Sequence, residues 1–176
     1  VVQTLLKNNK EVKSLKAKAS YILEETGRNT APAVYFAALN SNPKDILCIM
    51  PSDHWISDNK KFFSLIKSSV NSAKKGNWVT FGIKPYEPST AYGYIKVKNT
   101  QGKILYVAKF EEKPNKIKAK KFFKNVNYFW NSGIFIVSAE KCIESFKRFQ
   151  PNFVQLADRC WENRIQTNDE ITLKKS

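Results

Sequence analysis

The segment Tyr128-Phe129-Trp130-Asn131-Ser132-Gly133-Ile134-Phe135 decides the fold of this 176-residue chain. It is an aromatic run that Asn131-Ser132-Gly133 interrupts and apolar residues then resume. A packed strand rarely gives three positions to small or polar residues, except where its backbone or an amide side chain must approach a ligand. The segment therefore predicts a strand over residues 128–137 that carries part of a polar site.

Four other polar segments lie at the ends of predicted strands. They are Gly27-Arg28-Asn29-Thr30-Ala31-Pro32-Ala33, Pro51-Ser52-Asp53-His54, Thr90-Ala91-Tyr92-Gly93-Tyr94-Ile95 and Glu112-Lys113-Pro114. Strands that alternate with helices at this spacing indicate an α/β three-layer fold. In such folds ligands bind at the carboxyl ends of the strands. We therefore expect the five segments to form one site along an edge of an α/β/α sheet.

Hydrophobic periodicity predicts the other elements. The predicted strands cover residues 20–23, 46–50, 78–83, 92–97 and 104–111, and the predicted helices cover residues 33–39, 60–74, 116–124, 139–149 and 153–162. The continuous apolar run at 46–50 is typical of a parallel strand covered on both faces, which would place Cys48 in the core. Val1, Val2, Leu5 and Leu6 have helical spacing, and the polar tail from Thr167 is expected to fray. No linker or repeat is visible, so one domain is expected.

The formal net charge of +15 raises the question of a nucleic-acid partner. The lysines are spread over predicted helix faces and turns, and lysine outnumbers the arginine that specific nucleic-acid recognition favours. This pattern favours a solvated surface. No apolar run reaches the roughly 18–20 residues of a membrane span. The three cysteines show no paired spacing, which favours a cytoplasmic location. With only one histidine in the sequence, the same spacing argues against a zinc site.

Two strand ends carry candidate charged ligands. Asp53 directly follows a buried strand, where one carboxylate beside substrate phosphates commonly holds Mg²⁺. The alternative is that Asp53 caps the next turn or helix. Glu112 and Lys113 are followed by Pro114, which would let both reach one ligand, with the carboxylate on sugar hydroxyls and the ammonium on phosphate. The alternative is a surface charge pair. His54 has no catalytic partner at a recognisable spacing, so a structural role is expected.

Three further positions are candidates for contact with a neutral ligand group. Gly93 between two tyrosines suggests close backbone approach to a ligand, or else a bulge. Asn131 could bind a hydroxyl through its amide, or else form a local Asx turn. In the 27–33 segment, Asn29 or Thr30 can read the edge of a planar base beside a helix N-terminus. The alternative there is a capped helix start with Pro32 in the first turn.

Taken in order, these segments resemble the bacterial mannose-1-phosphate guanylyltransferases of the sugar nucleotidyltransferase family. Gly27–Ala33 is similar to the family segment GRNTAPA, Pro51–His54 to P-[SA]-D-H, Thr80–Pro85 to TFGIxP, Phe110–Pro114 to FxEKP and Trp130–Gly133 to WNSG. The resemblance covers about three-quarters of the chain. It implies a Rossmann-like nucleotidyltransferase fold and a reaction of GTP with α-D-mannose 1-phosphate that gives GDP-mannose and pyrophosphate.

The resemblance also implies roles for individual residues. Arg28, Asn29 and Thr30 would bind substrate, with Asn29 and Thr30 near guanine. Asp53 would hold the Mg²⁺ cofactor, and Lys113 would meet the sugar phosphate, so these two would be the catalytic residues. Gly93, Glu112 and Asn131 would hold the mannose. Glu25, Ser89 and Ala91 differ from the usual family residues.

The Gly-rich GGxGTRLWPLSR segment of the family has no counterpart in this sequence, nor does the later segment with a second Mg²⁺ aspartate. We therefore expect residues 1–176 to form a single partial domain that lacks the N-terminal loop segment and the C-terminal part, and to be inactive alone. Partners would be the two substrates, with a homo-oligomer or a complementing N-terminal polypeptide as further possibilities. The competing hypotheses are a non-catalytic sugar-phosphate or nucleotide-binding module and a basic nucleic-acid-binding protein, for which steep salt dependence would be diagnostic.

Overall fold

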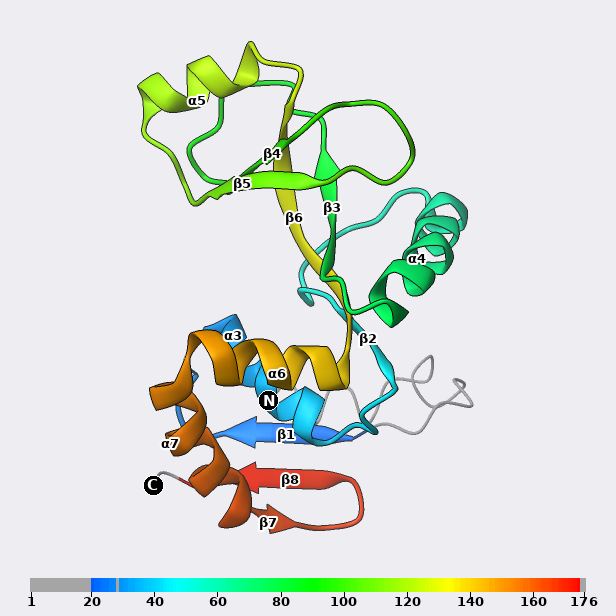
Figure 1. Ribbon diagram of the computed structural model, residues 1–176. Coiled ribbons are helices and arrows are strands. Elements are labelled where there is room, and N and C mark those ends of the chain that lie inside the picture. The colour runs from blue at the N-terminus through cyan, green and yellow to red at the C-terminus, as the bar shows by residue number, and fades with distance from the viewer. Residues whose placement is uncertain (1–19, 28, 175–176) are drawn as a thin grey trace. The chain divides into compact units, whose positions relative to one another are not determined.

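The structure, a computed structural model, describes residues 20–27 and 29–174 (Figure 1). The chain divides into two compact units. The first unit takes its described residues from 20–45 and 139–174, and the second is Ile46–Ser138. The predicted opening helix lies outside the described residues.

Strand β6, Tyr128–Ser138, is the centre of the sheet in the second unit, and it confirms the strand predicted there. It pairs antiparallel with β2 (Ile46–Ile49), β3 (Val79–Ile83) and β4 (Tyr94–Val97). Strand β4 also pairs antiparallel with β5, Val107–Glu111. Figure 1 shows β6 running through this unit with β3 and β4 beside it.

The parallel direction predicted for the 46–50 strand is wrong. Ile46 is opposite Ser138 and Ile49 is opposite Phe135, so β2 runs antiparallel to β6. Cys48, expected in the core, is exposed. An apolar run indicates that a strand is covered, but its direction depends on the path by which β6 enters the sheet, and the run does not encode that path.

The Asn-Ser-Gly interruption forms an irregularity in β6. Thr80 is opposite Phe135 and Gly82 is opposite Asn131, so one residue of β3 faces residues 132–134 of β6. Gly133 in this stretch has a φ of 72°, which glycine adopts without steric cost. The extra residues make a β-bulge, a feature that re-aims side chains near functional sites.

Two helices accompany this sheet, both close to their predicted bounds. Helix α4, Asn59–Lys74, begins where the Asp58 carboxylate accepts from the Lys61 N–H at 2.9 Å. Helix α5, Lys116–Phe123, has Asn115 as its N-cap, and the Asn115 side-chain oxygen accepts from the Lys118 N–H at 3.0 Å. The ring of Phe122 stacks on Tyr128 of β6 with centroids 4.2 Å apart, and this contact packs α5 against the sheet.

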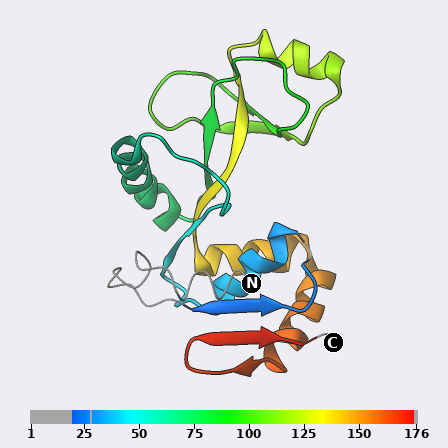
Figure 2. The same cartoon turned by 180° about the vertical axis from the view of Figure 1, so that it is seen from behind.

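The described residues of the first unit form three helices and a second, smaller sheet. Its elements are β1 (Tyr21–Glu24), α3 (Thr30–Leu39), α6 (Ala139–Phe149), α7 (Pro151–Glu162), β7 (Ile165–Gln166) and β8 (Glu170–Leu173). All three helices were predicted, and α7 starts earlier than expected because Pro151 takes a first-turn position. Strand β8 pairs parallel with β1 and antiparallel with β7. Figures 1 and 2 show β1 and β8 side by side with the same direction.

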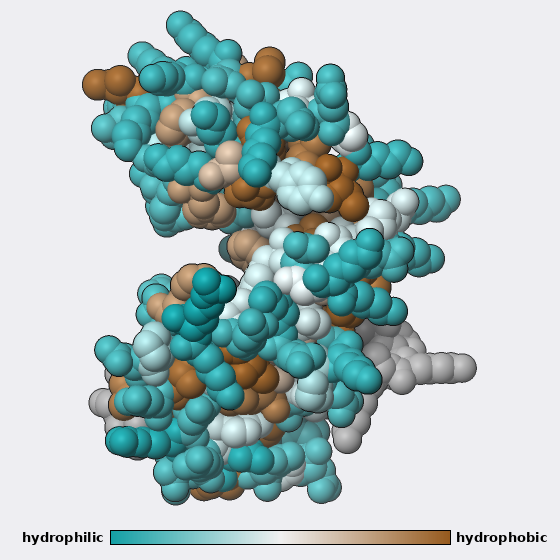
Figure 3. Space-filling model, viewed as in Figure 1, coloured by the Kyte–Doolittle hydropathy of each residue, from teal (hydrophilic) through white to brown (hydrophobic). Residues whose placement is uncertain are grey.

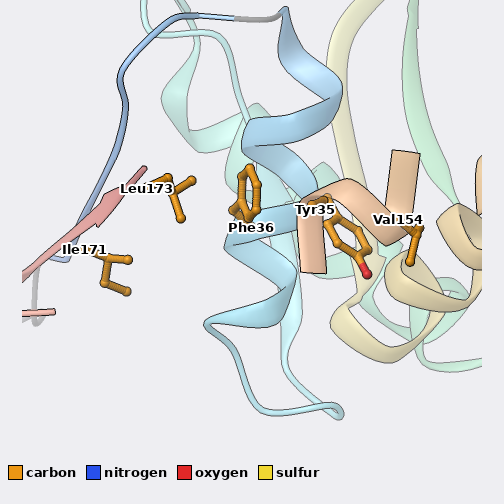
Figure 4. Close-up of a cluster of buried hydrophobic side chains, with 6 residues drawn as sticks. Tyr35, Phe36, Val154, Ile171 and Leu173 are labelled. Carbon is orange, nitrogen blue, oxygen red and sulfur yellow. The ribbon is translucent and has the colours of Figure 1, made fainter. Parts of the chain in front are cut away.

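The prediction that the tail from Thr167 frays is wrong, because this segment completes the core of the first unit. Ile171 and Leu173 of β8 are buried against Phe36 of α3. In Figure 4 the Phe36 ring lies toward Leu173 and the Tyr35 ring lies toward Val154 of α7. Ile171 and Leu173 alternate with polar residues, so β8 has one buried face. The prediction relied on the polar composition of the tail and overlooked this alternation.

Candidate functional site

Three predicted substrate-binding residues form one row where β5, β4 and β6 meet. In the register of these strands Gly93 directly precedes the pairs made by Tyr94, so it lies between Glu112 and Asn131. The Asn131 N–H donates to the Gly93 carbonyl at 2.8 Å. Residues directly opposite each other in a sheet face the same side. We call Glu112, Gly93 and Asn131 the Gly93 row.

Gly93 leaves the space that the Glu112 side chain occupies. A Cβ atom at Gly93 would lie 2.9 Å from Glu112 Oε2 and 3.4 Å from the ring of Phe110. Gly93 is buried and Glu112 is exposed. The group that comes close to Gly93 is the Glu112 carboxylate, and the approach of a ligand to Gly93 stays a prediction. The role of Glu112 toward a ligand stays a prediction too.

The side chain of Asn131 is held across the sheet. Thr80 Oγ1 of β3 lies 2.9 Å from Asn131 Oδ1 and 2.9 Å from the Ile134 carbonyl oxygen. This contact joins residues far apart in the sequence, so the alternative of a local Asx turn is wrong. Sequence reasoning assigned no role to Thr80, and the one available signal was its place in the Thr80–Pro85 motif.

The loop after β2 lies against the bulge of β6. A Cβ atom at Gly133 would lie 3.5 Å from Pro51 Cγ and 3.9 Å from His54 Cε1. Asp53 lies between these two loop residues and is exposed. The helix that follows is capped by Asp58, so the alternative in which Asp53 caps it is wrong.

Asp53 suits an open Mg²⁺ site better than a closed one. Within residues 20–27 and 29–174, no group of three or more His, Cys, Asp or Glu side chains could hold a metal ion. Magnesium keeps several waters and is usually bound by one or two carboxylates together with substrate phosphates. A single exposed carboxylate in a loop therefore fits this ion.

Strained backbone marks two of the predicted site residues. In the described part of the chain, the non-glycine residues with positive φ are Asn29, at 67°, and Lys113, at 34°. Lys113 also precedes Pro114, whose ring disfavours helical backbone at the preceding residue. Such strain costs on the order of 1–3 kcal/mol and is concentrated at functional sites. The exposed Lys113 side chain directly follows Glu112 of the Gly93 row.

Glu111 has a structural role that distinguishes it from Glu112. Its carboxylate accepts from the ammonium group of Lys109 and from that of Lys118 on α5. These hydrogen bonds, first from Lys109 and then from Lys118, lower the pKa of Glu111 to about 2. Glu112 directly follows β5, is exposed and takes no part in these two ion pairs.

The guanine-side residues predicted from sequence belong to the first unit. Arg28 lies outside the described residues. Asn29 is the N-cap of α3 with a ψ of −170°, and its side chain makes no capping hydrogen bond. The helix start predicted as the alternative is therefore present, with Thr30 as its first residue, but the Asn29 side chain does not close it. The Gly93 row and Asp53 belong to the second unit.

An aromatic cluster that sequence reasoning missed lies beside the Gly93 row. The rings of Tyr86 and Tyr92 contact Trp130, with centroids 4.8 and 4.9 Å apart. Trp130 is only 3% exposed, and its Nε1 has no hydrogen-bond partner among the described residues. Tyr92 directly precedes Gly93, so the cluster joins the row through the backbone.

The described helices include none that is both long and apolar enough to cross a membrane.

Comparison with known proteins places the chain in a family. The sequence profile of the nucleotidyl transferase family matches residues 1–173. The xanthan biosynthesis protein XanB of Xanthomonas campestris is 38% identical over 160 residues, which cover 89% of this chain and 34% of XanB. A mannose-1-phosphate guanylyltransferase of Escherichia coli is 38% identical over 168 residues, which cover 86% of this chain and 35% of that protein. The alginate biosynthesis protein AlgA of Pseudomonas fluorescens is 35% identical over 173 residues, which cover 94% of this chain and 36% of AlgA.

These relatives are longer proteins, and the chain spans about a third of their length. A crystal structure of a mannose-6-phosphate isomerase from Helicobacter pylori matches with a TM-score of 0.84 and 31% identity, over 94% of this chain and 64% of that chain. A mannose-1-phosphate geranyltransferase structure from Thermus thermophilus matches with a TM-score of 0.70 and 24% identity, over 86% of this chain and 51% of that chain. The α/β nucleotidyltransferase fold predicted from the sequence is thereby confirmed. Since the family profile covers nearly all of its residues, the chain belongs to the nucleotidyl transferase family.

Proposed function

We propose that this chain provides the mannose 1-phosphate side of a mannose-1-phosphate guanylyltransferase. That enzyme joins GTP and α-D-mannose 1-phosphate and releases GDP-mannose and pyrophosphate. The Gly93 row carries the proposal, because it sets a carboxylate and an amide on either side of a residue without a side chain. The relative of that name in Escherichia coli supports the choice of reaction.

The chemistry of the row suits a sugar phosphate. The Glu112 carboxylate can accept hydrogen bonds from sugar hydroxyls, and the Asn131 amide can bind a further hydroxyl. The Lys113 ammonium, next along the chain, can pair with the phosphate. The exposure of Glu112 and Lys113 leaves both charges available to a ligand.

Transfer would proceed by attack of a sugar-phosphate oxygen on the α-phosphorus of GTP. The new O–P bond forms as the bond to the β-phosphate oxygen breaks, and pyrophosphate leaves. No covalent intermediate with the protein is needed, so the chain acts by positioning and charge stabilisation. Lys113 would hold the sugar phosphate, and Asn29 and Thr30, with Arg28, would contact guanine. Asp53 would bind Mg²⁺, which neutralises negative charge on the phosphates.

The proposal extends to the location of the protein. Cys48 and Cys142 are free thiols, which supports the reducing environment of the cytoplasm.

The test is calorimetric titration of the 176-residue chain with mannose 1-phosphate. We expect saturable binding that Glu112→Gln and Lys113→Met each weaken about tenfold, because each loses a charged hydrogen-bonding group. Lys124→Met and Glu162→Gln are the matched controls, since both side chains are exposed and outside the proposed site. Failure of the wild-type chain to bind, or equal binding by Glu112→Gln, would contradict the proposal. Pyrophosphate release on addition of GTP and Mg²⁺ would distinguish an enzyme from a binding module.

A further inference from the structure

We propose that Thr80 is a positioning residue that turns the Asn131 amide so that its oxygen faces the ligand. The consequence is a sugar site built from two acceptors, which selects a ligand with two neighbouring hydroxyl donors. The identity of that ligand rests on the proposed function, whereas the orientation of the amide does not.

The Thr80 hydroxyl carries one proton but lies close to two acceptor oxygens. Its Oγ1 lies 2.9 Å from Asn131 Oδ1 and 2.9 Å from the Ile134 carbonyl oxygen. A hydroxyl has one proton, so it can donate fully to only one of these two oxygens. With the amide oxygen toward Thr80, Asn131 Oδ1 and the Ile134 carbonyl oxygen compete for the single Thr80 hydroxyl proton.

A half-turn of the Asn131 amide resolves the competition. The NH₂ group then donates to Thr80 Oγ1, and the Thr80 hydroxyl donates to the Ile134 carbonyl. Each of the three groups has a partner of the correct kind, which a partly buried network requires. After the turn Asn131 Oδ1 is directed away from Thr80, and in the part of the chain that the structure describes no other side-chain hydrogen bond of Asn131 is present.

The bulge of β6 is what allows the Thr80 hydroxyl to reach both Asn131 and the Ile134 carbonyl. Thr80 is in register with Phe135, yet its hydroxyl also reaches Asn131 because the register shifts between Thr80 and Gly82. A regular strand would place Asn131 and the Ile134 carbonyl too far apart for one side chain to contact both. The Thr80 side chain is thereby held by backbone and side-chain groups of the same bulge.

The Gly93 row then presents acceptors on both sides. A Cβ atom at Gly93 would lie 2.9 Å from Glu112 Oε2, and Asn131 is opposite Gly93 on the other neighbouring strand. Ionised carboxylates accept only, and Gly93 contributes no side-chain donor. A diol such as two adjacent hexose hydroxyls complements this pattern, because each hydroxyl can donate one proton.

Nuclear magnetic resonance of the ligand-free, ¹⁵N-labelled chain tests the orientation directly. The side-chain NH₂ of Asn131, assigned through its loss in Asn131→Asp, should exchange with solvent at least about tenfold more slowly than that of the exposed Asn152. Thr80→Val should abolish the protection, and Thr80→Ser should restore it because it keeps the hydroxyl. Unprotected Asn131 in the wild-type chain, or unchanged protection in Thr80→Val, would overturn the proposal.

A binding experiment tests the consequence for selectivity. Mannose 1-phosphates with fluorine at the 2-, 3- or 4-position each lack one donor, and we expect two neighbouring positions to lose about tenfold or more in affinity. Thr80→Val should remove the discrimination at one of them, and Thr80→Ser should retain it. Equal binding of all analogues would overturn the two-acceptor site. A chain that shows the protected amide but binds no mannose 1-phosphate would contradict the proposed function and leave the assignment of Thr80 standing.

Discussion

At the scale of single residues, Gly93 shows how a missing side chain builds a site. We predict that Gly93→Ala displaces Glu112, because the new Cβ atom would lie 2.9 Å from Glu112 Oε2. The Glu112 carboxylate ends a flexible side chain, so the free energy of unfolding should fall by only about 1 kcal/mol. Affinity for mannose 1-phosphate should fall about tenfold, since Glu112 leaves the row. Urea unfolding and calorimetric titration measure the two effects.

The control for Gly93→Ala is the same change in a Glu112→Ala background. Removing the carboxylate removes the closest contact and leaves only the Phe110 ring at 3.4 Å, so Gly93→Ala should cost less there than in the wild type, and the two changes should not be additive. Strict additivity would show that crowding against Glu112 is not what Gly93 avoids.

The sequence predicted Gly93 and Asn131 of the Gly93 row because each is an unusual residue in or beside a strand. Gly93 between two tyrosines and Asn131 beside Ser132 and Gly133 are costly choices in a strand. Thr80 could not be identified in this way, because a threonine in a strand is an ordinary choice. Its contact with Asn131 depends on the register shift of β3 against β6, and no local pattern encodes that shift.

At the scale of elements, periodicity predicted the strands and helices better than it predicted their pairing. The bounds of α6 agree with the prediction, and β6 ends within one residue of it. The antiparallel direction of β2 and the pairing of β8 with β1 depend on contacts between segments distant in sequence. Such contacts leave no period in either segment.

The pairing of β5 with α5 predicts a dependence of stability on pH. The pKa of Glu111 is lowered to about 2 by its hydrogen bonds to Lys109 and Lys118. Because the folded state binds this proton more weakly than the unfolded state, the stabilisation is complete above the ordinary pKa of 4.5 and is lost as the pH falls toward 2. Urea unfolding at several pH values should show Glu111→Gln less stable than the wild type at pH 7 and nearly equal near pH 2. A difference that stays constant across this range would contradict the assignment.

At the scale of the whole molecule, neither the net charge nor the face shown in Figure 3 identifies a partner. The face shown in Figure 3 is mostly hydrophilic, with apolar residues scattered among polar ones. The charge of +15 belongs to lysines spread through the sequence, so it is better explained by solvation than by one binding surface. What organises the molecule is its division into two units, each with a core of its own. Tyr35 and Phe36 belong to the core of the first unit, and Tyr94 and Trp130 to that of the second.

The free thiols offer a separate probe of each unit. Cys142 of the first unit is fully buried, and burial raises the pKa of its thiol to about 11. Cys48 of the second unit is exposed, although partial burial also raises the pKa of its thiol. Only the thiolate attacks a disulfide reagent, so an aromatic disulfide at pH 8 should modify Cys48 in the native chain and Cys142 only after the first unit opens. Peptide mass spectrometry along a urea series would follow both sites, with Cys142→Ala as the control for assignment. Rapid modification of Cys142 without urea would show that the α3, α6 and α7 core does not close around it.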